Sequence, residues 1–341
     1  MEVFPDLRVV GGLPVGVRKY NNMTDVALDT GPDVLDPAKF RNRLTTLDGS
    51  DRASVALTGL ETLWFNTGTL CNLACANCYI ESSPSNDRLA YLSAAECDRY
   101  LDELDQDWQA REIGFTGGEP FMNPEFPAML TSALERGYQV LVLTNAMRPM
   151  MKHAELVLGL KEKYGDKLHV RVSVDHYTSE RHEEERGKFA WDRMLPGLKF
   201  LSDHGFHLSV AGRTFWAESE AQLRAGFGRF FDAQNITIDP KDPERLVLFP
   251  EMDEGTDVPE ITTACWGILD VSPDAMMCAN SRMVVQRRGE DTAAVVACTL
   301  LPYDDEFELG TSLKSASCDV HLNHPHCARF CVLGGGSCSV G

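Results

Sequence analysis

Eleven cysteines are the residues of this chain best suited to chemistry, and they are unevenly distributed over its 341 residues. Cys71, Cys75 and Cys78 form a CxxxCxxC group, and Cys97 stands alone. The others lie toward the C-terminal end, at Cys265, Cys278, Cys298, Cys318, Cys327, Cys331 and Cys338. Cysteines in a chain without an export signal are expected to stay reduced, so we interpret the clustered ones as metal or cluster ligands and not as disulfides.

The CxxxCxxC group has the ligand number of an open iron-sulfur cluster. Three neighbouring thiolates cannot complete a structural zinc site without a fourth ligand. A four-iron cluster held by three thiolates leaves one iron free to bind a substrate or cofactor. The alternatives are a zinc knuckle, or three cysteines that bind no common metal or cluster. Cys97 lies inside a predicted helix and is expected to be a small packing residue.

The elements that must position these cysteines alternate between strand and helix. Ser93 to Glu96 reads as a capping box, and QVLVLT at 139–144 has the unbroken apolar character of a strand covered on both faces. The sequence predicts strands at 62–69, 112–116, 139–144, 168–175, 208–215 and 246–249, and helices at 93–105, 126–136 and 218–234, with another ending at 204–205. This alternation predicts βαβ units around a parallel sheet, either a barrel or an open doubly wound sheet.

The chain divides into three predicted segments. Residues 1–60 are a turn-rich lead-in, residues 61–250 are the strand and helix core, and residues 251–341 form a cysteine-rich domain after an acidic linker. In a parallel barrel, the C-terminal ends of the strands carry the loops of the active face. The CxxxCxxC group follows the first strand, which places it at that face.

This group, after the first strand of a repeated β/α pattern, resembles that of the radical S-adenosylmethionine (radical SAM) superfamily. The resemblance covers residues 62–249 and implies a partial (β/α)6 TIM-like barrel. In the family, three such cysteines hold a 4Fe-4S cluster whose open iron binds the amino and carboxylate groups of S-adenosyl-L-methionine. Reductive cleavage of that molecule then releases a 5′-deoxyadenosyl radical.

The same resemblance implies which residues contact S-adenosylmethionine. Residues 116–120 (TGGEP) are similar to the family's GGEP motif, in which Gly117 and Gly118 admit a close backbone approach and Glu119 pairs with the methionine ammonium. Asn145 closes the third strand as the family's TNG-like element does, with Ala146 in place of glycine.

Two further contacts are implied for the nucleoside. Ser173 and Asp175 are alternate residues that share one face of a strand, and they match the family's pair that binds the ribose hydroxyls. Asn77 departs from the family, which usually has an aromatic residue before the third cysteine. Tyr79, one place after that cysteine, is the candidate adenine contact.

The C-terminal cysteines resemble the SPASM extension of radical SAM enzymes, whose core spacing is CxxC, five residues, C, three residues, C. The spacing is kept here with His321 in the second position. The resemblance implies one or two auxiliary 4Fe-4S clusters. A two-cluster assignment uses one ligand set of Cys318, His321, Cys327 and Cys338 and another of Cys265, Cys278 and Cys331, with Cys298 completing the second or free.

Two alternatives remain for this region. One is a single cluster in the shorter twitch arrangement, with His321 as a spacer, and the other is a zinc site built from the same residues. His324 and His326, on either side of Pro325, are expected to be exposed turn residues.

Composition limits the partners. The formal net charge is −19 with no basic run, which disfavours nucleic acid and anionic membranes. No apolar run approaches the roughly 18 residues of a membrane span. The first residues lack the features of a secretory signal, so the cytoplasm is the expected location.

The sequence therefore predicts a radical SAM enzyme that abstracts a substrate hydrogen, most simply in peptide or protein modification of the RiPP type. A small molecule or cofactor precursor is the alternative substrate. A non-catalytic iron-sulfur or zinc protein is the alternative from another class. The resemblance also implies an electron donor such as flavodoxin or ferredoxin.

Overall fold

The computed structural model describes residues 34–250 and 253–335. Its main feature is an eight-stranded sheet with the order β7-β6-β5-β4-β3-β2-β8-β9. Neighbouring strands from β7 to β8 are parallel, and only β9 runs antiparallel to its neighbour. The barrel strands are β2 (Thr62–Asn66), β3 (Glu112–Thr116), β4 (Gln139–Thr144), β5 (Leu168–Ser173), β6 (His207–Arg213) and β7 (Leu246–Phe249).

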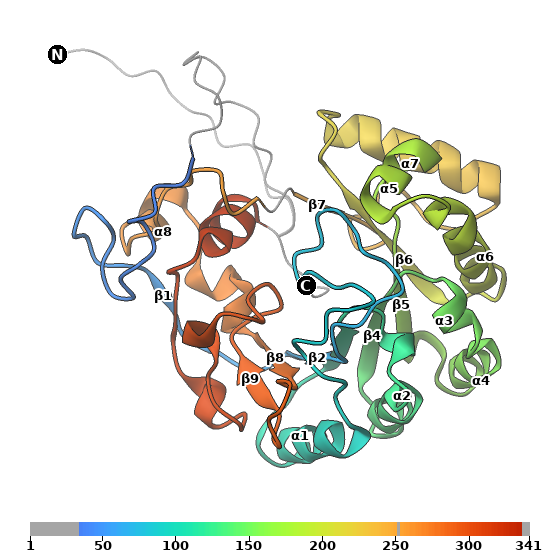
Figure 1. Ribbon diagram of the computed structural model, residues 1–341, viewed down its shortest axis with the longest axis horizontal. Helices are drawn as coiled ribbons and strands as arrows, with labels where there is room; N and C mark the ends of the chain where they lie inside the picture. The colour runs from blue at the N-terminus through green and yellow to red at the C-terminus, as the bar shows by residue number, and fades with distance from the viewer. Residues whose placement is uncertain (1–33, 251–252, 336–341) are drawn as a thin grey trace. The chain divides into compact units, whose positions relative to one another are not determined.

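Helices cover one face of this sheet (Figure 1). Ser93 begins the first of them, because its side chain accepts a hydrogen bond from the backbone N–H of Glu96. The helices are α1 (Ala94–Asp107), α2 (Phe126–Glu135), α3 (Arg148–Met151), α4 (Ala154–Tyr164), α5 (Ser179–Arg186), α6 (Ala190–Asp203) and α7 (Glu220–Gln234). The predicted partial (β/α)6 barrel is confirmed in this repeated strand and helix order. Helices α3 to α5 went unpredicted.

Alternate residues of the strands face two different cores. Leu63 and Phe65 point to the core under the helices, whereas Trp64 points to a second core shared with the C-terminal region. Gly114 on the neighbouring strand makes room for this tryptophan, since a Cβ atom there would lie 2.3 Å from the indole ring. Burial on both faces explains why the strands read as continuous apolar runs.

The cysteine-rich region joins the barrel through β8 (Ser281–Val285), which pairs with β2 and is followed by β9 (Ala294–Val296). Its remaining regular elements are α8 (Cys265–Leu269), 3-10 turns at Pro273–Ala275, Met277–Ala279, Asp305–Phe307 and Ser315–Ser317, and a π-helix at Cys327–Leu333. Two short strands, β1 (Ser54–Val55) and β10 (Val320–His321), pair the lead-in with this region. The described residues all belong to one compact unit, and the three-segment division stays a prediction.

In the described part of the chain, no helix has the length and apolar character needed to cross a membrane.

Candidate functional site

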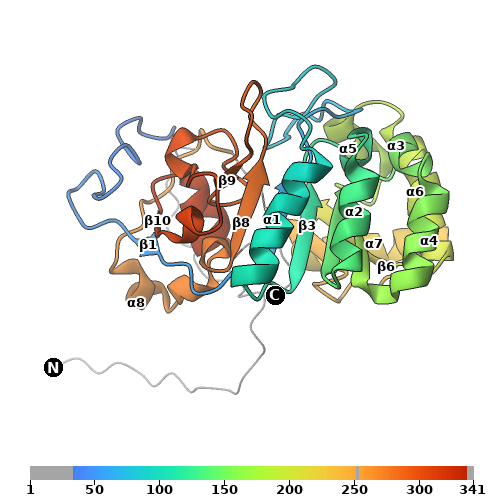
Figure 2. The ribbon, with the colours of Figure 1, turned by 90° about the horizontal axis from the view of Figure 1, so that it is seen from below.

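The three neighbouring cysteines lie on the loop after β2. The strands β2 to β5 are parallel neighbours, so this loop shares one edge of the sheet with the loops that follow β3, β4 and β5. Figure 2 shows the loop at the same edge as helix α5. Cys71 is 5% exposed, while Cys75 and Cys78 are partly buried.

Backbone amides already point at two of these sulfur atoms. The N–H of Leu73 donates to Cys71 Sγ over 3.4 Å, and the N–H of Ser82 donates to Cys78 Sγ over the same distance. Hydrogen bonds of this kind stabilise thiolates and adjust the potentials of iron-sulfur clusters. The donor set therefore fits a cluster held by three thiolates.

The charge environment of the thiols supports the same fit. Burial raises the pKa of Cys71 to about 12 and also raises the pKa of Cys75, in both cases with a contribution from a neighbouring cysteine. The charge of Arg186 opposes the shift at both thiols. Burial and crowding disfavour free thiolates, so such thiols are stabilised when a metal replaces their protons.

The position of this loop is fixed by its neighbours. Asn77 Nδ2 donates to both carboxylate oxygens of Glu185 on α5, over 2.8 and 3.0 Å, and the N–H of Ala76 donates to the Glu185 carbonyl oxygen. The residue that departs from the family pattern thus attaches the cysteine loop to α5.

Gly117 and Gly118 pack against the same loop. A Cβ atom on Gly118 would lie 2.3 Å from the carbonyl oxygen of Leu70, and one on Gly117 would lie 2.6 Å from that of Gly68. Gly117 also has φ +134°, which side chains disfavour. The glycines are therefore required by contact with the cysteine loop itself. Their approach to a cofactor stays a prediction.

Glu119 is a buried carboxylate that connects two strand ends. It accepts hydrogen bonds from Thr144 Oγ1 at 2.8 and 3.0 Å, from the N–H of Asn145 at 2.8 Å and from the N–H of Phe121 at 3.3 Å. Burial raises the pKa of Glu119 to about 7. The hydrogen bonds lower the pKa, but their effect is smaller than that of burial. Asn145 in turn donates to Asn72 Oδ1 over 3.0 Å, which brings the GGEP and TNG-like residues to the cysteine loop.

Asp175 lies beside a residue that the sequence reasoning missed. Arg186 donates to both of its carboxylate oxygens, over 2.6 and 3.2 Å, with side-chain exposures of 13% for the arginine and 6% for the aspartate. Burial raises the pKa of Asp175, but the Arg186 charge and hydrogen bonds bring it below its usual value. Ser173, the other predicted ribose contact, is half-buried at the end of β5. Arg186 belongs to none of the matched motifs, so the sequence did not mark it as a site residue.

Two further polar residues face this region. Arg213, at the end of β6, has a buried Nε atom without a hydrogen-bond partner among the described residues, and it lies near Asp175, Glu185 and Cys78. His182 on α5 is fully buried, and burial lowers its pKa to about 3. Neither side chain belongs to a recognisable sequence motif.

The two remaining predicted positions differ in outcome. Tyr79 is half-buried and packs against the core shared with the C-terminal region, so its adenine contact stays a prediction. Cys97 is fully buried in α1 within the core under the helices, as a packing residue would be.

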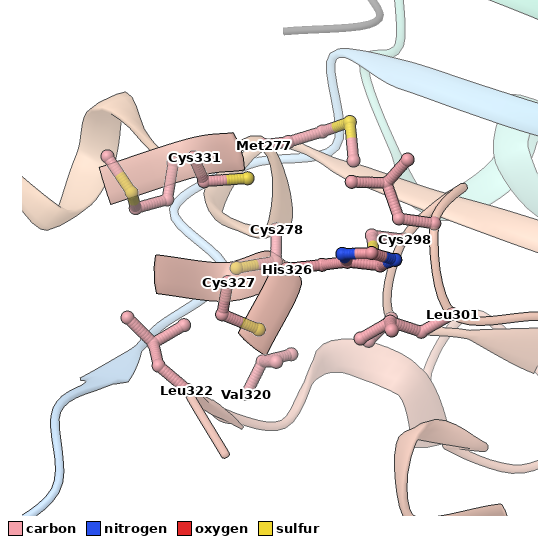
Figure 3. A pocket seen from close by; sticks show the side chains of 12 residues that line it. Met277, Cys278, Cys298, Leu301, Val320, Leu322, His326, Cys327 and Cys331 are labelled. Atoms are coloured by element: carbon pink, nitrogen blue, oxygen red, sulfur yellow. The ribbon is translucent and has the colours of Figure 1, made fainter. Parts of the chain in front are cut away.

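A second group of cysteines lines a pocket in the C-terminal region (Figure 3). Cys278 comes from a 3-10 turn before β8, Cys298 follows β9, and Cys327 and Cys331 lie four residues apart in the π-helix. Burial raises the pKa of Cys327 well above its usual value, and the charges of Cys298 and Cys278 add to the shift. Cys327 therefore lies near Cys298 and Cys278, and Cys331 lines the same pocket.

The other predicted C-terminal ligands are not among the residues that line this pocket. Cys265 lies in α8 and its sulfur accepts a hydrogen bond from the N–H of Thr262, whereas Cys318 is exposed. His321 lies on β10, paired with β1. Cys338 lies outside the described residues. The two-cluster assignment stays a prediction. The pocket is lined by Cys278, Cys298, Cys327 and Cys331, which that assignment divides between two ligand sets.

The expectation that His324 and His326 are exposed is wrong. His326 is 3% exposed, lines the cysteine pocket and has its Nε2 atom 3.0 Å from a carboxylate oxygen of Glu254. His324 is half-buried, and its Nδ1 accepts the N–H of His326 over 3.1 Å. The fold buries the His326 ring in the cysteine pocket and partly covers His324, which a short polar run around a proline does not reveal.

The combination of strand order and site defines the class of protein. Residues 65–215 match the sequence model of the Radical SAM superfamily. They form a radical SAM domain, as the resemblance predicted.

Curated relatives match over less than half of the chain. The antilisterial bacteriocin subtilosin biosynthesis protein AlbA of Bacillus subtilis is 35% identical over 147 residues, 42% of this chain and 31% of AlbA. The mycofactocin maturase MftC of Mycolicibacterium smegmatis is 30% identical over 136 residues, 40% of this chain and 33% of MftC. The matches thus span about a third of each relative.

Solved structures share the fold over a longer stretch. Streptococcus suis SuiB bound to S-adenosylmethionine aligns with a TM-score of 0.55 and 14% identity, over 74% of this chain and 63% of SuiB. Native anSMEcpe with bound AdoMet aligns with a TM-score of 0.53 and 13% identity, over 75% of this chain and 80% of that protein.

Proposed function

We propose that this chain is a radical SAM enzyme that uses Cys71, Cys75 and Cys78 to hold a 4Fe-4S cluster. One observation carries the proposal: three crowded thiols, two of them already accepting backbone N–H groups, share a sheet edge with the residues of the GGEP and TNG-like motifs. A 4Fe-4S cluster held by these three cysteines would supply the electron for reductive cleavage of S-adenosylmethionine.

The residues around the thiols bind and orient the cofactor in this proposal. Glu119 faces the methionine ammonium, and Ser173 and Asp175 face the ribose hydroxyls. Arg186 and Arg213 are cations beside this site, and we assign the methionine carboxylate to them. Asp175 and Arg186 already pair, so binding exchanges one buried interaction for another.

We further propose one auxiliary 4Fe-4S cluster in the C-terminal pocket, held by Cys278, Cys298, Cys327 and Cys331. Four protein thiolates leave no iron open to a substrate. The auxiliary cluster therefore carries electrons, and does not anchor the substrate.

The substrate class is a peptide. AlbA is named for bacteriocin biosynthesis, MftC is named a maturase, and SuiB has been solved with its precursor peptide SuiA. Such chemistry requires a one-electron donor, for which flavodoxin or ferredoxin is suited. A small-molecule substrate is the second candidate, favoured by the match of 29% identity to the Fe-coproporphyrin III synthase of Methanosarcina barkeri.

The test is anaerobic reconstitution followed by addition of S-adenosylmethionine and a strong reductant. We expect 5′-deoxyadenosine from the wild type, none from Cys71→Ala, and undiminished product from Cys97→Ala, which removes a thiol that only packs in α1. A fully loaded protein that forms no 5′-deoxyadenosine would reject the function and leave a non-catalytic iron-sulfur protein.

The substrate is tested separately. Deuterium-labelled candidate peptides and small molecules are incubated with the loaded enzyme, and transfer of the label into 5′-deoxyadenosine is followed by mass spectrometry. Transfer from a peptide supports the first candidate. Transfer only from a small molecule supports the second.

A further inference from the structure

Arg282 is a charged side chain buried in the middle of β8. It is 1% exposed, and its backbone pairs with Leu63 of β2. Every hydrogen bond that its guanidinium makes in the described part of the chain ends on a backbone carbonyl oxygen. The acceptors are those of Ala316 at 2.8 Å, Cys278 at 2.6 Å, Ser281 at 2.8 Å and Cys318 at 3.1 Å.

Among the described residues, no carboxylate is hydrogen-bonded to this arginine. Within the described ranges, no Asp or Glu forms an ion pair with Arg282, whereas the equally buried Arg52 pairs with Glu260 over 2.5 Å. Carbonyl oxygens satisfy the N–H groups but leave the charge uncompensated, and an uncompensated buried charge is costly. A fold retains such a group where something supplies the opposite charge.

Several cysteines lie close enough to Arg282 for their charge, once ionised, to act on it. Cys278 and Cys298, two proposed cluster ligands, act on its guanidinium, together with Cys318 and the exposed Asp319. Neutral thiols cannot balance a cation. Thiolates that ligate iron can, because a four-thiolate iron-sulfur cluster is net negative and each added electron makes it more so.

We propose that Arg282 is the buried counter-charge of the auxiliary cluster and raises its reduction potential. The proposal rests on the auxiliary cluster proposed above. Net charge and hydrogen bonding around a cluster set its potential, so a fixed cation stabilises the reduced form more than the oxidised form. A higher potential suits a cluster that must accept the electron left on a substrate radical. Arg282 also fixes the loops that end at Cys278 and Cys318 through its carbonyl contacts, which makes it a positioning residue.

The test measures the midpoint potential of the auxiliary cluster in the reconstituted full-length protein. Wild type, Arg282→Lys and Arg282→Met are titrated and followed by electron paramagnetic resonance. We expect Arg282→Met to shift the reduction equilibrium at least tenfold toward the oxidised form, which is about 59 mV for one electron. Arg282→Lys keeps the charge and should stay within threefold of the wild type.

Two controls separate charge from loss of structure. The cluster at Cys71, Cys75 and Cys78 should keep its potential in the same samples. The double variant Arg52→Met/Glu260→Gln removes a buried arginine together with its compensating charge and should leave the auxiliary potential unchanged.

The outcomes distinguish the two proposals. A loaded Arg282→Met protein with an unchanged potential would overturn the role of Arg282 and leave the auxiliary cluster standing. If Arg282→Met cannot be loaded while Arg282→Lys can, the requirement for charge is supported. A wild type that retains four irons and not eight would overturn both proposals.

Discussion

Replacing Arg186 tests the electrostatics of the candidate S-adenosylmethionine site directly. The guanidinium and the Asp175 carboxylate are both buried and joined by two hydrogen bonds. Two unit charges about 4 Å apart interact by about 4 kcal/mol at an effective dielectric constant of about 20. Removing one partner of a buried pair costs about 3–5 kcal/mol, because the other charge is left uncompensated.

We therefore expect Arg186→Met to lower the free energy of unfolding of the cluster-free protein by about 3–5 kcal/mol at pH 7. Urea unfolding followed by circular dichroism, under anaerobic conditions, measures this change. Asp175→Asn added to Arg186→Met should recover most of the loss. Arg288→Met is the matched control, since its pair with Asp87 is exposed and should cost at most about 1 kcal/mol.

The pH dependence of the same variant has a definite sign. In the wild type the pKa of Asp175 lies below its usual value, so its stabilising effect is present above about pH 4 and is lost as the pH falls through the folded pKa. Without Arg186, burial dominates and the folded pKa lies above the unfolded one. The penalty of Arg186→Met should then grow as the pH rises from about 4. A penalty that is small or independent of pH would refute the reasoning.

Three other perturbations have equally direct outcomes. The pKa of Glu119 is raised to about 7 in the folded protein, so the folded state keeps this proton to a higher pH than the unfolded state does. The free energy of unfolding should therefore fall as the pH rises from about 4 to 7. Glu119→Gln should flatten this decline, as measured by thermal unfolding of the cluster-free protein. Gly118→Ala would place a Cβ atom 2.3 Å from the Leu70 carbonyl oxygen and should lower the iron content of the reconstituted protein. The control is Gly159→Ala, at a helical site with no neighbour within 4 Å, which should stabilise the protein by about 0.5–1 kcal/mol. Asn77→Ala should destabilise the protein by about 1.5–3 kcal/mol through its hydrogen bonds to the Glu185 carboxylate, and an unchanged urea midpoint would show that this contact does not fix the loop.

The sequence predicted the strands well because each is an apolar run between turn residues. Residues 112–116, 139–144 and 246–249 form strands with the predicted bounds. It did not predict α5, because that helix is highly polar and its attachment depends on Asn77, Glu185 and Asp175. The contact between Asn77 and Glu185 joins residues 108 positions apart, and such a contact leaves no periodicity in either segment.

The sequence by itself determined the cysteine spacing, the order of the motifs and the parallel sheet, since each is written in neighbouring residues. Only the tertiary structure decided which C-terminal cysteines share a pocket and that Arg186 and Arg282 lie beside thiols. The resemblance to the SPASM extension grouped Cys318 and His321 with Cys327, whereas the π-helix and the turn before β8 place Cys278, Cys298, Cys327 and Cys331 around one pocket. The physical reason is that ligand geometry and charge compensation depend on distance in space, which the fold sets and the chain order does not.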